Sequence, residues 1–600
     1  MYDYKESYRK KIADVLTRLL NETTASTETI SPDQVVAEIP PNSEMGDLGF
    51  PMFSYAKLLR KGPPQIAHLV AAELPHSSAA GPYVNVRLNR TETAASILGE
   101  LLNEGGGSPP GHPATLKGSR IMVEFSSPNT NKPLHLGHLR NDVLGESISR
   151  ILASCGAEVR KVCIINDRGI HICKSMLAYR EYGEGKTPES EGVKSDRFVG
   201  DWYVRFNKDL KEETEALKRE KGLDDKEAEA QAAVLRRAQE LLRQWEAGDG
   251  ETVELWKKMN AWAIDGWKET YRRTGVTFDK YYYESETYLL GKDEILKGLE
   301  KGIFYREEDG SVQVDLSNEK LGKKVLLRKD GTSIYITQDL GTAINRHEDW
   351  PFDRLIFVVG SEQQYHFKVL FILLQKLGFE WARNLYHLSY GMVNLPEGKM
   401  KSREGTVVDA DDLIDSLKEM AIEEIRGKER EEAVGDPEAA AEKIAIGALH
   451  YYLLQASPAK DMLFDPKESL SFNGNTGPYL QYMGARISSL LRKAEVRGSI
   501  ITGAKIRFDC LGGDAEWELI KTLGNYNDAV AAAAAAMDAS LLTAYLYELA
   551  KNFSRFYHEC PILNAEEPDI AFARLSLSRA VLKVLTGALE LVCIPFLEVM

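Results

Sequence analysis

The chain has 600 residues, 43% of them hydrophobic and 28% charged, and a net charge of −15 at pH 7. This length can bury several cores and predicts three or four domains, at about one per 150 residues. The opening segment carries charges throughout and no long apolar run follows, so the sequence indicates neither a signal peptide nor a membrane span. The acidic total does not exclude a nucleic-acid partner, because phosphate contact depends on the local field of a groove.

The six cysteines include no C-x-x-C pair. This pattern argues against a zinc ribbon and against the disulfide framework of a secreted protein. We therefore expect a cytoplasmic protein without zinc and without a membrane anchor.

The first predicted domain, residues 1–108, is small and α+β. It has an amphipathic opening helix and a strand-like segment, GPYVNVRL, and it ends in the linker GGGSPPGHPATLKG, whose glycines and prolines favour a loop.

The second predicted domain, residues 117–430, is α/β. A β-rich run at 120–125, a helical pattern at 137–153 and a second strand at 159–165 form a β-α-β unit. The pattern resumes with strands at 354–359 and 385–393 around a helix at 365–377. Right-handed crossovers between parallel strands then predict a doubly wound, Rossmann-like sheet. A charge-rich helical insertion at about 180–330 interrupts it, and we expect this insertion to lie over the sheet.

The third predicted domain, residues 438–600, is an all-α bundle. One of its helices carries an apolar face at helical spacing, made by Leu542, Leu546, Leu549, Phe553 and Phe556.

The turn after the first strand of the α/β domain contains SSPNTNKPLHLGHLRN, with His135, Gly137 and His138 at its end. In this position a helix N-terminus and two imidazoles face an anion, and Gly137 allows backbone to approach a base or a ribose. Composition alone would give His-X-Gly-His about 0.02 times in this chain. The alternatives are a metal pair, which lacks an evident third ligand, and two ordinary surface histidines.

A second candidate element, GKMKSREGTVV, follows the last sheet strand and contains Lys399, Met400, Lys401, Ser402 and Arg403. Its interleaved glycines and cations suit a loop that closes over phosphates. Taken alone, it is equally consistent with a solvated basic turn.

Together the two motifs resemble the signatures of class I aminoacyl-tRNA synthetases. EFSSPNTNKPLHLGHLRN, DGTSIYITQDLG, FVVGSEQQYHF and NTGPYLQYMGARI resemble the arginyl-tRNA synthetase family, and matching segments extend to the C-terminus. The resemblance implies L-arginine, ATP with Mg²⁺ and tRNA(Arg) as reactants. It also implies a catalytic role for residues 399–403, a helical anticodon-binding domain and an N-terminal domain that contacts tRNA.

The chain departs from the family pattern at Ser402, where the loop signature has a lysine. The resemblance implies that Lys132, just upstream of the histidines, compensates for it. The sequence does not show how the role of the missing lysine is divided among Lys132, Lys399 and Lys401.

Arginine recognition requires acidic or carbonyl partners for a planar, permanently charged guanidinium. The resemblance implies that Tyr335, Asp339 and Gln363 hold this group. It implies that Glu124 and Asn129 lie near the α-amino and carboxylate end, and it adds Ser127 and His138 to the arginine-binding residues. The alternative for Asp339 is a favourable charge near a helix N-terminus, and Tyr335 alone would pass as a core residue.

Tyr479, Gln481 and Arg486 are the candidate tRNA contacts in the third domain, because unstacked bases are read by stacking and by hydrogen bonds. The predicted reaction forms arginyl-adenylate and pyrophosphate, then transfers arginine to the terminal ribose of the tRNA. Another class I ligase, a nucleotidylyltransferase and a non-catalytic tRNA-binding paralogue are the alternatives. A monomer is the default expectation.

Overall fold

The computed structural model describes residues 4–24, 27–102, 111–394, 396, 408–427, 434–496 and 506–600. The chain forms two compact units. The first comprises Met1–Pro110, Ile487–Asn527 and Glu548–Leu585, and the second comprises Gly111–Arg486, Asp528–Tyr547 and Thr586–Met600. The second unit contains the parallel sheet.

The N-terminal part of the first unit is a small α+β fold around a three-stranded antiparallel sheet of order β1-β3-β2. Its elements are α1 (Tyr4–Thr24), β1 (Leu48–Pro51), α2 (Ala56–Leu59), α3 (Pro63–Glu73), β2 (Ser77–Ala80), β3 (Tyr83–Val86) and α4 (Arg90–Leu102). Buried side chains of α1, α3 and α4 supply the apolar core, among them Ile12, Ile66 and Ile97.

The central sheet of the second unit has five parallel strands in the order β11-β10-β4-β5-β6. Its strands are β4 (Arg120–Glu124), β5 (Glu158–Ile165), β6 (Lys280–Tyr283), β10 (Arg354–Gly360) and β11 (Leu385–Tyr390). The first strand in sequence therefore lies in the middle, and the order reverses between β4 and β10. In such doubly wound sheets, ligands bind beyond the carboxyl ends of the strands at this reversal.

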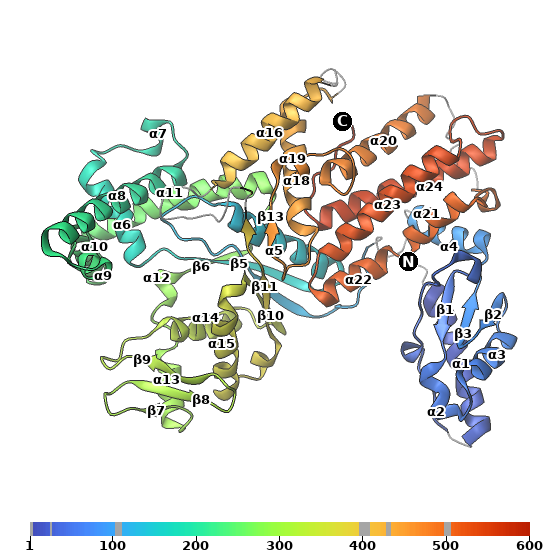
Figure 1. Cartoon of the computed structure of the whole chain (residues 1–600), viewed down its shortest axis with the longest axis horizontal. Coiled ribbons are helices and arrows are strands. Elements are labelled where there is room, and N and C mark those ends of the chain that lie inside the picture. The colour runs from blue at the N-terminus through green and yellow to red at the C-terminus, as the bar shows by residue number, and fades with distance from the viewer. Residues whose placement is uncertain are drawn as a thin grey trace. The chain divides into compact units, whose positions relative to one another are not determined.

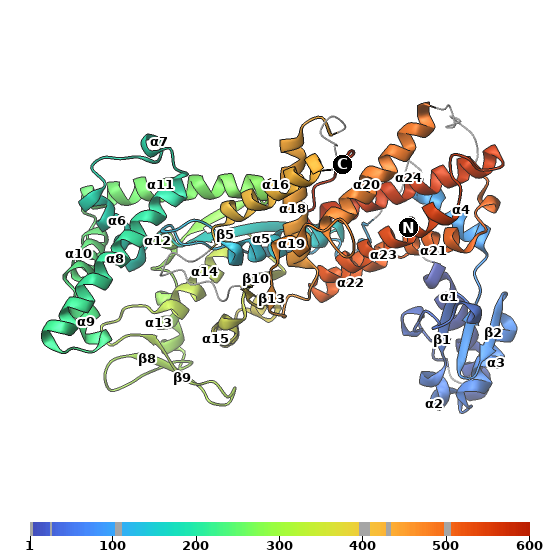
Figure 2. The same ribbon diagram turned by 45° about the horizontal axis from the view of Figure 1, so that its top comes forward.

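Helices cover both faces of this sheet, as Figures 1 and 2 show: α5 (Leu136–Ser154) and α18 (Pro437–Leu454) lie on one side, and α14 (Tyr335–Asp349) and α15 (Gln364–Lys376) lie on the other. The second face buries a large apolar cluster that includes Leu340, Leu355 and Leu373. Most side chains of α5 are buried, and Gly145 meets the ring of Phe125 so closely that a Cβ there would lie 2.2 Å from it.

The segment between β5 and α14 contains more than helices. Its helices are α6 (Ile170–Tyr182), α7 (Pro188–Glu191), α8 (Ser195–Lys221), α9 (Asp225–Gln231), α10 (Ala233–Glu246), α11 (Gly250–Thr274), α12 (Glu284–Thr287) and α13 (Lys292–Glu300). Between them the chain contributes the sheet's edge strand, β6, which the sequence analysis did not predict. It also forms an antiparallel sheet of β7 (Tyr305–Arg306), β8 (Val312–Leu316) and β9 (Gly322–Leu327).

The elements after the central sheet are almost all helical. They are β12 (Val393–Asn394), α16 (Ala410–Gly427), β13 (Met462–Leu463), α19 (Pro466–Ser469), α20 (Gly477–Val496), α21 (Asp514–Gly524), α22 (Tyr526–Ala536), α23 (Ser540–Glu559) and α24 (Pro568–Leu591). The predicted apolar face lies on α23, and its five side chains are fully buried. Among the described residues, no helix is long and apolar enough to cross a membrane.

Candidate active site

Parallel pairing places the carboxyl ends of all five central strands along one side of the sheet, which is called the carboxyl edge here and differs from the edge strand β6. The segments after β4, β5, β6 and β10 therefore lie at this same edge. The segments after β4 and β5 are joined directly: the Asn166 N–H donates to Pro128 O (3.0 Å) and the Thr130 N–H to Asn166 O (3.2 Å). This edge carries the residues predicted for both phosphate and amino-acid binding.

The turn after β4 has an unusual backbone. Ser126 and Ser127 have φ values of 71° and 50°, a left-handed conformation that side chains other than glycine rarely adopt. Asn141, on α5, stabilises it: its carbonyl oxygen accepts from the Ser126 N–H (2.5 Å), and its amide donates to Val358 O on β10 (2.7 Å). One buried amide thus joins the turn after β4 to β10, the neighbouring strand across the reversal of the sheet order.

The two motif histidines lie at the N-terminus of α5. The Gly137 N–H donates to His135 Nδ1, and the His135 N–H donates to His138 Nδ1, both at 3.1 Å. The imidazole centroids are 3.8 Å apart. Because each Nδ1 accepts a hydrogen bond, each neutral ring carries its proton on Nε2, which makes Nε2–H a donor.

Steric room for a neighbouring side chain is a second reason why glycine occupies position 137. A Cβ at this position would lie 3.0 Å from Cε1 and 3.1 Å from Nδ1 of His135, closer than such contacts normally are. The sequence analysis ascribed Gly137 to the approach of a nucleotide. The structure shows that it makes room for the neighbouring imidazole.

Burial keeps these histidines neutral. Burial and, to a lesser extent, the positive charge of Lys132 together lower the pKa of His135 to about 3. Burial, followed by the charges of His135 and Lys132, lowers the pKa of His138 well below its usual value. Burial also lowers the pKa of Lys132. The carbonyl of Lys132 accepts a hydrogen bond from the Trp267 indole of α11 at 3.1 Å, so the insertion supports this turn.

The predicted loop residues Lys399, Met400, Lys401, Ser402 and Arg403 lie outside the described residues. The segment that follows them pairs with the histidine turn: the Leu136 N–H donates to Val408 O (3.4 Å) and the Ala410 N–H to Leu134 O (2.9 Å). Residues 408–410 therefore lie beside His135.

The predicted guanidinium ligands come from two elements at the same edge. Tyr335 is the first residue of α14 and is 77% exposed. Asp339 follows one turn later on α14, and Gln363 is exposed at the end of the short 3₁₀ segment Ser361–Gln363 after β10. Asp339 accepts a hydrogen bond at Oδ2 from His366 Nε2 on α15 (2.6 Å).

The residues predicted for the other end of the substrate differ in exposure. Asn129 is exposed, whereas Glu124 is buried and forms an ion pair with Arg346 of α14. The other oxygen of Glu124 accepts from Ser127 Oγ at 3.4 Å. Burial raises the pKa of Glu124, Arg346 lowers it, and the charge of Asp339 raises it. Both oxygens of Glu124 thus have partners within the protein, and its contact with a substrate stays a prediction.

The sequence analysis missed a further carboxylate at this edge, Glu284, which directly follows β6. Burial, helped by the charges of Asp167 and Asp339 and opposed by the charge of Arg168, raises its pKa to about 7. Asp167 fixes the start of α12 by accepting from Ser285 N (2.8 Å) and Oγ (2.7 Å). A signal was present in the sequence: KYYYE is a β-rich aromatic run that ends in an acid.

Comparison with known proteins decides the family. A model described as "tRNA synthetases class I (R), catalytic domain" matches residues 107–466, and one described as "Arginyl tRNA synthetase N terminal domain" matches residues 6–88. The chain is 59% identical over 612 residues to a protein of Treponema denticola named "Arginine--tRNA ligase", with all of both chains covered. The chain belongs to the arginyl-tRNA synthetase family.

Other relatives agree. A Treponema pallidum arginine–tRNA ligase is 53% identical, again with all of both chains covered. The solved arginyl-tRNA synthetase of Thermus thermophilus has a TM-score of 0.78 and 27% identity, covering 99% of this chain and 100% of that one. The Plasmodium falciparum enzyme, at 19% identity and a TM-score of 0.76, shares the fold and covers 99% of each chain. These similarities confirm the predicted family and fold class.

A third family model, "DALR anticodon binding domain", matches residues 480–600 of this synthetase. Tyr479 is partly exposed at the start of α20, with its ring 6.1 Å from that of Tyr547, and Arg486 is partly exposed further along this helix. Gln481 is a correction: it is fully buried, and its amide donates to Lys443 O and Pro595 O, both at 2.8 Å. In this position it joins α18 to the C-terminal segment and does not face an RNA.

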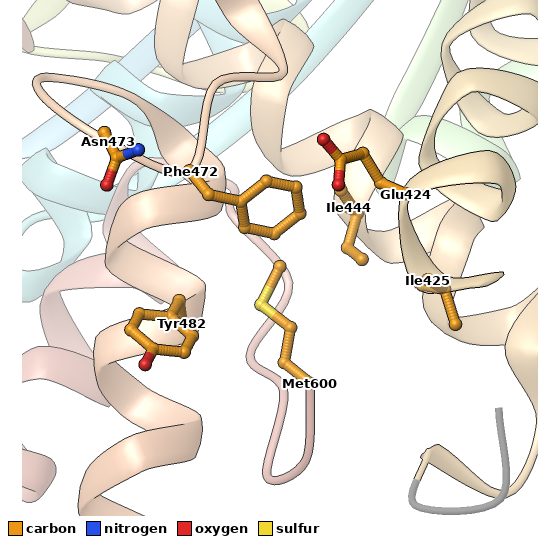
Figure 3. A pocket seen from close by; sticks show the side chains of 7 residues that line it. All are labelled: Glu424, Ile425, Ile444, Phe472, Asn473, Tyr482 and Met600. Atoms are coloured by element: carbon orange, nitrogen blue, oxygen red, sulfur yellow. The ribbon is translucent and has the colours of Figure 1, made fainter. Parts of the chain in front are cut away.

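A cavity of about 270 Å³ lies close to Tyr482, within the second unit (Figure 3). Phe472 and Met600 point toward one another across it, and Tyr482 lies on α20 at its side. Its remaining lining residues are Glu424, Ile425, Ile444 and Asn473. The lining therefore combines apolar and aromatic surface with a few polar groups, as expected of a ligand pocket.

Proposed function

We propose that the chain activates L-arginine with ATP and transfers it to the terminal ribose of tRNA(Arg). The observation that carries the proposal is the position of the His-X-Gly-His turn. It lies beside the reversal of a parallel sheet, in a chain matched by the class I catalytic model over residues 107–466. The arginine carboxylate attacks the α-phosphorus of ATP and releases pyrophosphate. The ribose hydroxyl then attacks the activated carbonyl and releases AMP.

In the first step, we propose that the histidines act as neutral donors. Nδ1 of each ring is occupied by a backbone N–H, which leaves Nε2–H to donate to phosphate oxygens as charge accumulates on them. Lys132 supplies the positive charge near both rings. A preorganised donor of this kind lowers the barrier by about 2 to 4 kcal/mol.

For the substrate side chain, we propose an acidic cup made by Asp339 and Glu284, with Tyr335 and Gln363 at its rim. Its support is electrostatic: the charge of Asp339 raises the pKa of Glu284, so the two carboxylates lie close enough to interact. A guanidinium bound between them relieves this repulsion and forms charge-assisted hydrogen bonds. Glu124, neutralised by Arg346, is less suited to this role.

Magnesium fits this site as a companion of ATP. The described side chains include no group of three or more His, Cys, Asp or Glu residues that could hold a metal ion. The donors around the histidine turn are imidazoles and an ammonium, which suit phosphate oxygens. Mg²⁺ is commonly carried by the phosphates of its nucleotide, where it neutralises their charge.

For the tRNA, we propose contacts from Tyr479 and Arg486 and from the cavity beside Tyr482. An unstacked base needs an aromatic or apolar surface and a polar group at its edge. Phe472, Tyr482 and Asn473 offer both. A Tyr482→Ala variant should then bind tRNA(Arg) less tightly, by about 1 to 3 kcal/mol for a lost stacking contact, without altering arginine affinity.

The test is pyrophosphate exchange with each amino acid in turn, with and without purified tRNA(Arg), followed by aminoacylation. We expect exchange with arginine, dependent on tRNA as the family resemblance implies. Exchange with a different amino acid would point to another class I ligase. Absence of exchange together with tight tRNA binding would point to a non-catalytic binder. The expected monomeric state is checked by sedimentation of the same preparation.

Asp339→Asn tests the cup itself. Loss of a charge-assisted hydrogen bond should weaken arginine use by about 1.5 to 3 kcal/mol in kcat/KM. The ATP KM should stay unchanged, because the phosphate donors lie on other elements. Unchanged arginine kinetics would remove Asp339 from the proposed site.

A further inference from the structure

The Asp339 carboxylate is held by a side chain from a different element. His366, in the first turn of α15, donates from Nε2 to Asp339 Oδ2 over 2.6 Å. Within the described parts of the chain, this is the one hydrogen bond that the Asp339 carboxylate accepts, so Oδ1 is left without a partner. The His366 side chain is 27% exposed and that of Asp339 is 45% exposed.

The two residues belong to different parts of the fold. Asp339 lies on α14, which precedes β10, whereas α15 follows β10 and packs through Phe367 against Phe357 of that strand, with ring centroids 4.9 Å apart. The imidazole of His366 makes an edge contact with Phe367 at 5.8 Å and 89°. The donor therefore lies on a helix that packs against β10, and the acceptor lies on α14, the helix that precedes this strand.

We propose that His366 is a positioning residue for arginine specificity. Its Nε2–H fixes the rotamer of Asp339 so that Oδ1 faces the planar guanidinium, a role that needs a hydrogen-bond donor and no positive charge. The proposal rests on the acidic cup proposed above and adds the group that orients it. A carboxylate free to rotate would attract any cation, whereas a fixed carboxylate favours the directional donors of a guanidinium over the point charge of an ammonium.

The test compares His366→Ala with His366→Gln in the full chain, using tRNA-dependent pyrophosphate exchange. The Ala variant should raise the arginine KM about tenfold, with kcat and the ATP KM within about twofold of the unmodified chain. It should also lower the preference for arginine over lysine. The Gln variant keeps an N–H donor at similar reach and should restore most of the arginine KM.

His347→Ala is the matched control. This residue is an imidazole on α14 that stacks on Trp381, with centroids 4.9 Å apart, and its loss should leave the arginine KM unchanged. A double-mutant cycle locates the effect, because His366→Ala should add nothing to Asp339→Asn if it acts through that carboxylate.

Three results would overturn the inference alone, given an unmodified chain that is active with arginine. They are an unchanged or lower arginine KM in His366→Ala, a Gln variant as impaired as Ala, and an undiminished effect in the Asp339→Asn background. An unmodified chain that shows no arginine-dependent exchange would overturn the proposed function together with the inference.

Discussion

Gly137→Ala should slow catalysis without destabilising the fold. Gly137 is the second residue of α5, so alanine fits the helix and should stabilise it by up to about 1 kcal/mol. The added Cβ would lie 3.0 Å from the His135 ring, which then has to move by a few tenths of an ångström. That shift lengthens the 3.1 Å hydrogen bond from the Gly137 N–H to His135 Nδ1. The Nε2–H of His135 is then no longer held in one orientation.

The expected loss follows from this geometry. Removing one preorganised anion donor costs about 2.7 to 4 kcal/mol, or about 100- to 1,000-fold in rate. A donor displaced but not removed should lose part of this, about 10- to 100-fold in the rate of pyrophosphate exchange. The melting temperature measured on the same sample should be unchanged or higher.

The matched control is Gly99→Ala, a helical glycine of α4 whose Cβ would meet nothing within 4 Å. It should gain the same helix stabilisation and keep full exchange activity. If Gly137→Ala exchanged at the rate of the unmodified chain, the assignment of His135 as an oriented phosphate donor would be refuted. A drop in melting temperature would place the defect in folding instead.

Three further changes test neighbouring groups. Lys132→Ala should slow adenylate formation while leaving tRNA affinity intact, and loss of tRNA binding alone would contradict its assignment to the phosphates. Glu284 has a pKa of about 7, so its negative charge is lost as pH falls through that value. The arginine KM should therefore rise between about pH 8 and pH 6, and Glu284→Gln should abolish this dependence. Burial raises the pKa of Asp142 to about 8, although Ser126 opposes this shift, so ionisation destabilises the fold as pH rises. Asp142→Asn should raise the free energy of unfolding by about 2 to 4 kcal/mol near pH 8, with a gain that shrinks toward pH 4 in denaturant titrations.

The β-α-β units were predictable because their signals are local. The run RIMVEF, the turn after it and the helical spacing that follows identify β4, the histidine turn and α5 to within a residue or two. Parallel pairing then implies that residues following different strands meet at one edge. The assignment of Asp339 and Gln363 to the arginine site, by contrast, came from the family resemblance and not from strand pairing.

The interactions that the sequence did not reveal are tertiary. Glu284 ends the aromatic run KYYYE, but this run lies inside a segment predicted to be a helical insertion, so it was not recognised as a strand of the central sheet. The Glu124–Arg346 ion pair joins residues 222 positions apart, so nothing near Glu124 indicated that it already has a partner. Gln481 was misjudged for a related reason: helical periodicity places it on a face, but only packing shows which face is buried.

The protonation of the histidine turn follows from how many charges one buried site can hold. Lys132 and two imidazolium rings together would place three cations in a site of low dielectric, at a high desolvation cost. Burial and mutual repulsion keep both rings neutral, with a pKa of about 3 at His135. One ammonium and two neutral donors remain. Neutral donors bind the ground-state phosphates weakly and gain most when charge grows on the oxygens, which is the condition for lowering a barrier without trapping the substrate.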